Sequence, residues 1–278
     1  TRPATLAGQA FARAVYGDHP FGRDATPQTL AAIDTAAMQA FYRRHVVACR
    51  AQVSLVGAID RAGAERLVGQ LMAALAPNGC PSLDPVPDVQ RLREAVERRI
   101  PFDAAQAQVL IGQPGMRRSD PDYFPLFVGN YILGGGGFVS RLSTEVREKR
   151  GLSYSVYSYF APGLQSGAFQ LGLSTRPDQA NQALGVAREV LQRFVADGPT
   201  EAELKAAKDY LLNGFALRLD SNRKLLDNVA NIAWYDLPLD YLDGWTAQVQ
   251  RVSVADIRRA FQRALQPERM VTVVVGAP

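Results

Sequence analysis

The stretch "LGGGGFVSRLSTEVREKRGLSYSVYSYF", from Leu133 to Phe160, joins four glycines, an arginine-rich segment and a tyrosine-rich segment. The glycines predict the end of a preceding helix, and Ser140 is placed to cap a second helix. The apolar series Phe138, Leu142 and Val146 would form the inner face of that helix. Gly151 predicts a left-handed turn at its end, and the alternation that follows predicts a strand. We therefore expect a helix end, a helix, a corner and a strand.

Two side chains at this corner are candidates for chemistry. Arg147 lies in the last turn of the expected helix and Tyr154 begins the strand, so both can project from the same corner. Guanidinium and phenol groups are hydrogen-bond donors, suited to a peptide carbonyl oxygen that gains negative charge. In the alternative interpretation, Arg147 pairs with Glu145 or Glu148, and Tyr154 is a core residue. The residues alone leave both interpretations open.

The four glycines do not predict a nucleotide site. Neither the G-x-G-x-x-G nor the G-x-x-x-x-G-K-[ST] spacing is present, and a helix rather than a strand precedes them. The tyrosines further along have two open roles. An aromatic-rich edge strand can accept an extended peptide by β-augmentation, whereas Tyr157 and Tyr159 could equally pack within the sheet.

The composition is that of a globular protein. The chain has 278 residues, 47% hydrophobic and 21% charged, with a net charge of +4. The basic residues are scattered rather than massed, which disfavours a nucleic-acid partner. No run approaches the roughly 18 apolar residues of a membrane span, so none is predicted. Cys49 and Cys80 are too few for a zinc knuckle, although a single bridge between them is possible.

The expected elements indicate an α+β fold, in which helices cover one face of a sheet. Helices are expected over residues 3–16, 27–45, 60–76, 123–133, 178–197, 200–217, 220–236 and 253–266. Strands are expected over 50–60, 94–100, 106–113, 153–159, 167–175 and 270–276. A proline-rich connector separates the two groups and predicts a linker, because proline cannot donate to a backbone ladder.

An internal repeat relates the two ends of the chain. "FYRRHVVACRAQVSLVGA", which begins at Phe41, resembles "FQRALQPERMVTVVVGA", which begins at Phe261. Asp18 and Asp236, Phe41 and Phe261, and Gly57 and Gly276 are separated by 218, 220 and 219 residues. We expect residues 1–80 to be the C-terminal part of a first repeat truncated at its N-terminus, 81–92 a linker, and 93–278 a complete second repeat.

A family resemblance rests on these segments. "YFPLFVGNYILGGGGFVSRLSTEVREKRGLSYSV" and "DGPTEAELKAAKDYLLNGFALRLDSN" resemble the second half of the pitrilysin/insulinase family of zinc metallopeptidases, which includes mitochondrial processing peptidase. The match is to the "inactive domain" type of bacterial subunit, which keeps an Arg/Tyr element. It implies tandem homologous α/β-sandwich domains of the metallopeptidase LuxS/processing-peptidase-like type.

The resemblance implies a zinc site that this sequence does not carry. The family binds zinc through an inverted H-x-x-E-H helix in the first domain and a further glutamate downstream. The only histidines here, His19 and His45, have no such motif around them. We expect both to be ordinary surface or helix-dipole residues and assign no metal ligand to this chain. Zinc is expected in the parent protein or in a partner.

The resemblance also assigns roles to the corner. In the family an arginine and a tyrosine of this element hold the substrate near the scissile bond, and Arg147 and Tyr154 match them. The expected function is the substrate-binding half of a zinc endopeptidase, inactive alone. Its expected partners are a peptide or protein substrate and a zinc-bearing homologous subunit or a second copy, in the periplasm. The alternative is a non-catalytic scaffold subunit of a larger complex.

Overall fold

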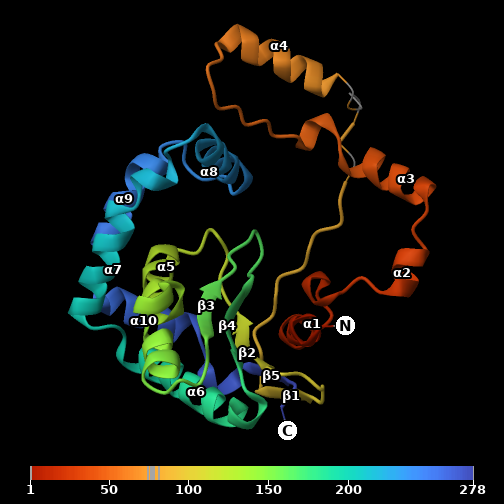
Figure 1. Cartoon of the computed structure of the whole chain (residues 1–278). Coiled ribbons are helices and arrows are strands. Elements are labelled where there is room, and N and C mark those ends of the chain that lie inside the picture. Colours follow the sequence, from red (N-terminus) through yellow and green to blue (C-terminus); the bar gives the residue numbers. More distant parts are fainter. Residues whose placement is uncertain (1, 74, 76–78, 81, 278) are drawn as a thin grey trace. The chain divides into compact units, whose positions relative to one another are not determined.

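The structure is a computed structural model that describes residues 2–73, 75, 79–80 and 82–277. It divides into two compact units, shown with the course of the chain in Figure 1. Unit 1 comprises Thr1–Arg23, Pro87–Asn213 and Gly244–Pro278, and unit 2 comprises Asp24–Val86 and Gly214–Asp243. No helix among the described residues is long and apolar enough to cross a membrane.

Unit 1 is built on a five-stranded mixed sheet of order β1-β5-β2-β4-β3. β1 is parallel to β5, and the other neighbouring pairs are antiparallel. The strands are β1 (Val96–Ile100), β2 (Ala107–Pro114), β3 (Ser155–Phe160), β4 (Ala168–Thr175) and β5 (Val271–Val275). The five strands expected in this part of the sequence are therefore confirmed, with β3 at an edge.

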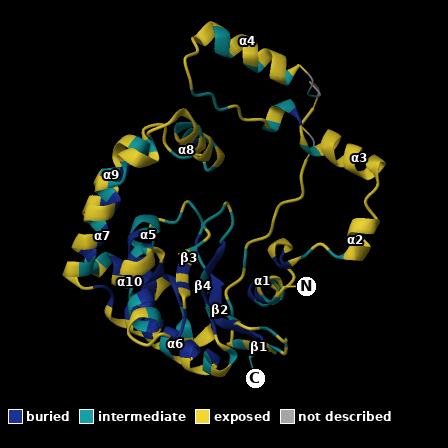
Figure 2. Cartoon of the chain, in the orientation of Figure 1, coloured by how far each residue is buried: buried dark blue, intermediate teal, exposed yellow. Residues whose placement is uncertain are grey.

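Three helices cover one face of the sheet. They are α5 (Tyr123–Asn130), α6 (Ala180–Asp197) and α10 (Val254–Ala264). Their core includes Phe169, Phe194 and Phe261, all fully buried, and the last two rings meet edge to face at 4.9 Å. Figure 2 shows β2 and β4 as mostly buried, whereas β1 and alternate residues of β3 are exposed. Burial of large aromatic side chains is a dominant contribution to such a core.

The opposite face of the sheet is partly covered as well, which corrects the expectation of a single covered face. α1 (Pro3–Tyr16) packs on β2 and β5 through a separate apolar cluster. That cluster comprises Ala7, Phe11, Val15, Leu110, Ala168, Val271, Val273 and Val275. Its residues on β5 alternate with those facing the other helices, as a strand buried on both faces requires. The expected helix over 3–16 is confirmed.

The remaining helices differ from the sequence expectations in detail. α7 (Glu201–Asn213) and α8 (Asn222–Trp234) fall within their expected ranges, whereas α9 (Tyr241–Arg251) was not predicted. The single helix expected over 27–45 is divided into α2 (Pro27–Ala31) and α3 (Thr35–His45). The division falls at Asp34, whose carboxylate accepts the Ala37 amide at 2.7 Å and so caps the second helix.

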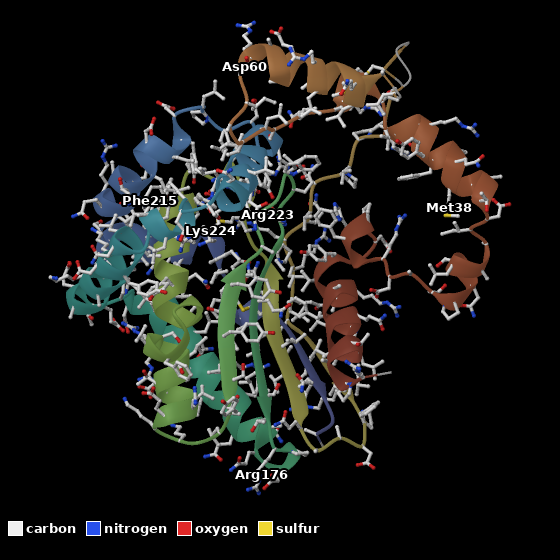
Figure 3. All side chains as sticks on the ribbon, turned by 45° about the horizontal axis from the view of Figure 1, so that its top comes forward. Met38, Asp60, Arg176, Phe215, Arg223 and Lys224 are labelled. Atoms are coloured by element: carbon white, nitrogen blue, oxygen red, sulfur yellow. A yellow bond between two sulfur atoms is a disulfide. The ribbon has the colours of Figure 1, made fainter. Side chains whose placement is uncertain are left out.

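Unit 2 contains α2, α3, α4 (Arg61–Met72) and α8, with little buried apolar surface. The strand expected over 50–60 is wrong: residues 51–60 form no β-ladder, and only the short η2 turn (Ala48–Arg50) precedes them. A strand needs a neighbour for its backbone groups, and the described residues of unit 2 offer none. Apolar side chains such as Met38, labelled in Figure 3, stay 56% exposed.

The elements of the two ends recur at a constant shift. α1 and α8 begin at Pro3 and Asn222, and α3 and α10 begin at Thr35 and Val254, which is 219 residues in both cases. The η2 turn and η8 (Pro267–Arg269) repeat at the same shift. The corresponding helices do not stay together in one unit: α1 belongs to unit 1 although α3 belongs to unit 2, and α8 belongs to unit 2 although α10 belongs to unit 1.

Glycines 134–137 join α5 to β3 by close packing. The sequence predicted that the helix ends at the first glycine, but it continues as a π-helical turn, η3 (Tyr131–Gly135). A Cβ at Gly134 would lie 2.5 Å from both the amide nitrogen and Oγ of Ser158. Gly134 therefore lets the helix end rest against the backbone of β3.

Arg141 and Glu203 tie the segment after these glycines to α7. Nε and an Nη of Arg141 donate to the two carboxylate oxygens at 2.6 and 2.7 Å. The amide and hydroxyl of Thr200 also donate to Glu203, at 2.7 and 2.8 Å. Partial burial raises the pKa of Glu203, but these hydrogen bonds outweigh it and hold the pKa at about 2.

We expect this pair to make stability depend on pH. The folded pKa of Glu203 lies below its ordinary value of 4.5, so its stabilisation is present above about pH 4.5 and is lost as pH falls towards 2. Glu203→Gln should lower the melting temperature at pH 7, and the difference from wild type should shrink below pH 4. The exposed Glu189→Gln serves as the control. A constant difference from pH 7 to pH 2 would contradict the assignment.

The packing of Gly134 gives a second expectation. Gly134→Ala should destabilise the protein by about 1–3 kcal/mol, the usual cost of overpacking, because its methyl group collides with β3. Gly185→Ala in α6 is the matched control, because a Cβ there meets nothing within 4 Å. The control should be neutral or stabilising by up to about 1 kcal/mol through helix propensity. Equal urea-unfolding midpoints for the two variants would exclude the close approach.

Candidate functional site

The candidate site lies where a helix meets strand β3. After the glycines, η4 (Gly137–Val139) leads to Ser140, whose Oγ accepts the Ser143 amide at 3.3 Å and begins the next helical segment. That segment, η5 (Ser143–Glu148), is followed by a turn to Gly151, which adopts the expected left-handed conformation at φ 62°. The Gly151 amide donates to the carbonyl of Arg147 at 2.8 Å. The corner therefore has the geometry that its sequence predicts.

The structure brings Arg147 and Tyr154 together. The guanidinium carbon of Arg147 lies over the Tyr154 ring, 4.8 Å from its centroid. Tyr154 is 80% exposed, so it is not a core residue. The half-buried guanidinium and the exposed phenol ring therefore lie together beside the first residue of β3.

Arg147 forms no ion pair with any described residue, so the interpretation in which it pairs with Glu145 or Glu148 is wrong. Glu145 instead accepts hydrogen bonds from Lys149 and Arg150, each at 2.7 Å. The hydrogen bond from Lys149 lowers the pKa of Glu145 most, and the hydrogen bond from Arg150 lowers it further. Since the nearby carboxylate is occupied, the N–H donors of Arg147 remain available to a ligand.

Phe138 belongs to this site, although the sequence interpretation placed it on the inner face of the helix. It is 64% exposed, and its ring centroid lies 4.3 Å from the guanidinium carbon of Arg147. The prediction failed because it assumed one continuous helix from Phe138 to Val146, whereas η4 and η5 are separate segments. Its position directly after the glycine run was the available signal.

A groove of about 670 Å³ lies beside the site, along β3 and the end of α5. Its lining includes Gly137 and Ser155, the sequence neighbours of Phe138 and Tyr154. The remaining lining residues are Met116, Tyr123, Phe127, Asn130, Gly134, Gly135, Val156, Tyr157, Ser158, Tyr159, Phe160 and Pro162. The groove thus combines aromatic walls with a few polar groups, as ligand-binding grooves do.

The edge of β3 is closed at its centre. The register places the outward-directed backbone groups at alternate residues, and Ser158 is one of them. Its carbonyl accepts a hydrogen bond from Nδ2 of Asn130 at 3.1 Å, and Gly134 packs on its amide. The exposed rings of Tyr157 and Tyr159 stack on one another at 6.0 Å instead. These contacts disfavour addition of a peptide strand along β3.

The histidines do not form a metal site. His19 is buried, not at the surface as expected, and its Nδ1 accepts the Phe21 amide at 3.1 Å while Nε2 lies 3.0 Å from the Pro87 carbonyl. His45 stacks on Phe41 at 4.2 Å. Within the described residues no three His, Cys, Asp or Glu side chains gather as metal ligands. The residues present therefore do not fit the zinc ion implied by the resemblance.

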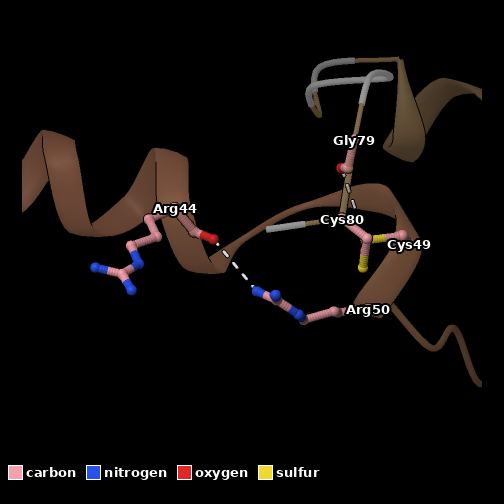
Figure 4. Close-up of a disulfide and its surroundings, with 5 residues drawn as sticks. All are labelled: Arg44, Cys49, Arg50, Gly79 and Cys80. Carbon is pink, nitrogen blue, oxygen red and sulfur yellow. Dashed lines mark hydrogen bonds between the residues drawn. A yellow bond between two sulfur atoms is a disulfide. The ribbon is translucent and has the colours of Figure 1, made fainter. Parts of the chain in front are cut away.

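Cys49 and Cys80 form a disulfide in unit 2 (Figure 4). Their Cα atoms are 5.9 Å apart and 31 positions separate them in sequence. The bridge joins the residues before the unpaired segment to those after α4. The sequence left open whether these two cysteines are bridged, and the structure shows that they are.

Comparisons with known proteins agree on one family. The family profile "Peptidase M16 inactive domain" matches residues 32–211. An uncharacterized zinc protease of Streptomyces coelicolor is 29% identical over 98% of this chain and 60% of its own length. A non-peptidase homolog, YmxG of Helicobacter pylori, is 31% identical over 56% of this chain and 36% of its own.

A solved structure supports the same relationship. The peptidase M16 inactive domain from Pseudomonas fluorescens superimposes with a TM-score of 0.93 at 33% identity, covering 100% of this chain and 66% of that one. The chain thus spans less than two thirds of the length of these relatives. The expected α+β fold is confirmed: helices pack on a single mixed sheet, as in the peptidase M16 inactive domain of that structure. The chain belongs to the peptidase M16 inactive domain family.

Proposed function

We propose that this chain is the substrate-positioning half of a zinc-dependent endopeptidase. Arg147 and Tyr154 donate hydrogen bonds to the carbonyl oxygen of the scissile peptide as it gains negative charge during attack by water. Donors directed at developing charge lower the barrier because they stabilise the transition state more than the bound substrate. The metal and the attacking water belong outside the described residues.

The unpaired guanidinium of Arg147 carries this proposal. Glu145 pairs with Lys149 and Arg150, no ion pair joins Arg147 to Glu148 or to any other described residue, and the Arg147 guanidinium lies over two aromatic rings. An arginine that served only the fold would be expected to hold a carboxylate, as Arg141 holds Glu203. The Tyr154 ring beside it is 80% exposed, and its hydroxyl would supply a second donor.

The zinc-bearing part is proposed to dock on unit 2. Residues 51–56 have no strand partner, and exposed apolar side chains lie on α3 and α4, including Phe41 at 65% and Leu71 at 54%. Such a surface fits a further sheet, which a homologous segment or a homologous partner subunit would supply. The relatives named as zinc proteases are longer than this chain, which agrees with this arrangement.

Mixing experiments test the proposal. The chain alone should not cleave a quenched-fluorescent peptide library, and adding a homologous subunit that carries H-x-x-E-H should give cleavage that EDTA abolishes and zinc restores. In that mixture Arg147→Ala should lower kcat about 10²- to 10³-fold, the usual effect of removing one oxyanion donor. Tyr154→Phe should lower kcat in the same direction.

The matched controls are Arg193→Ala on the surface of α6 and Tyr210→Phe on the surface of α7. Both remove the same chemical group at an exposed position outside the corner, and both should retain activity within about twofold. Full activity of Arg147→Ala combined with Tyr154→Phe would refute the assigned roles. So would cleavage by the chain alone.

A scaffold function is the second candidate, because one matching relative is named a non-peptidase homolog. A scaffold would bind its partner through the apolar surface of unit 2 without cleaving peptides. Co-purification as a stable complex, with no metal-dependent cleavage of the peptide library, would favour this function over the first.

We further propose a periplasmic location. The Cys49–Cys80 disulfide supports it, since disulfides persist in oxidising compartments and are rare in reducing ones. Protein purified from the native compartment, denatured without reductant, should therefore show no thiol that reacts with Ellman's reagent. Two reactive thiols would contradict both the bridge and the location.

The bridge should also stabilise unit 2. Closing a loop of this length restricts the unfolded chain and contributes roughly 3 kcal/mol. Cys49→Ser with Cys80→Ser should increase proteolytic cleavage between residues 46 and 82 and leave hydrogen exchange of the β2 and β4 amides unchanged. Unchanged proteolysis of the segment would show that the bridge contributes nothing to unit 2.

A further inference from the structure

We propose that Phe138 is a positioning residue for Arg147: its ring, together with that of Tyr154, holds the guanidinium in place while its hydrogen-bond donors stay available. The inference rests on the proposed function, which concerns Arg147 and Tyr154 only. It adds a third residue and the interaction by which it acts.

Three separate elements meet at this contact. Phe138 comes from η4, Arg147 from η5, and Tyr154 from the residues before β3. The guanidinium carbon lies 4.3 Å from the centroid of Phe138 and 4.8 Å from that of Tyr154, both within the range of cation–π attraction. No ion pair with a described residue competes with these contacts.

The type of contact matters for the chemistry. A carboxylate would orient Arg147 by accepting its N–H groups and would offset its charge. A ring instead contacts the flat face of the guanidinium, so the N–H groups at its edge remain available and the charge is retained. Stacking therefore restricts a long side chain, which has several rotatable bonds, without occupying the groups that would bind the substrate.

The exposure of Phe138 fits this role. It is 64% exposed and its neighbour Val139 is 75% exposed, so neither side chain contributes much to the core. The contact between Phe138 and Arg147 is the ring interaction that the structure records for this phenylalanine. Removing the ring should therefore alter the orientation of Arg147 with little effect on the stability of unit 1.

Nuclear magnetic resonance of the chain alone tests the contact. The Hε signal of Arg147, assigned with Arg147→Lys, should be displaced by the ring currents of wild type and should move towards the free-arginine value in Phe138→Leu. Phe138→Tyr should keep the displacement, and Val139→Ala, which removes an equally exposed apolar side chain, should not change it. An Hε signal insensitive to Phe138→Leu would overturn the proposal.

Kinetics in the mixture with the zinc-bearing subunit test the consequence. Phe138→Leu should lower kcat roughly two- to fivefold with little change in KM, in keeping with the strength of an exposed cation–π contact. Phe138→Tyr should restore wild-type kcat, and Val139→Ala should match wild type. If Arg147→Ala is inactive while Phe138→Leu is fully active, the positioning role is refuted and the proposed function stands. If Arg147→Ala is fully active, the proposed function fails, and the positioning role fails with it.

Discussion

The pairing of strand β5 on both sides is the constraint on which unit 1 depends. β1 and β2 occupy its two edges, α10 precedes it, and α1 covers one of its faces. All five of its residues are buried, which is possible only when every backbone group has a partner. The homologous residues 52–56, 219 positions earlier, have no such neighbours and form no ladder. The same kind of sequence is thus a strand in one unit and an unpaired segment in the other.

The exchange of α1 and α8 explains why the two copies differ in chemistry. In unit 1, α1 presents Phe11 to the valines of β5, and the contact is apolar. In unit 2, α8 presents Ala230 and Asn231 to Gln52 and Ser54 around an open space of about 640 Å³. Most residues that line this space are small or polar, and Trp234 of α8, which also lines it, stays 62% exposed. The helix α8 therefore covers this segment less completely than α1 covers β5.

The sequence predicted what local patterns determine and missed what neighbours determine. The strands of unit 1, the left-handed Gly151 and the approach of Arg147 to Tyr154 follow from periodicity and turn chemistry. The absence of pairing at residues 51–60 does not, because a β-branched run looks the same with or without a partner strand. The prediction for Phe138 failed for a related reason. The spacing of four residues between Phe138, Leu142 and Val146 assumes one continuous helix, whereas the chain turns after Val139. The π-helical turn through Gly135 places Gly134 against Ser158, which lies 24 positions later in sequence, and a local pattern does not reveal that approach.

Two arginines in the same short region show how the corner separates folding from chemistry. Arg141 donates to both oxygens of Glu203 and to the Gly198 carbonyl, and it thereby fixes the start of α7. The guanidinium of Arg147, six residues later, lies over the rings of Phe138 and Tyr154 and forms no ion pair with a described residue. A guanidinium bound to a carboxylate has its charge compensated and its donors occupied, so it can support a fold but cannot stabilise new negative charge. One held by rings keeps both properties, and for that reason the proposed function assigns the substrate contact to Arg147 rather than to Arg141.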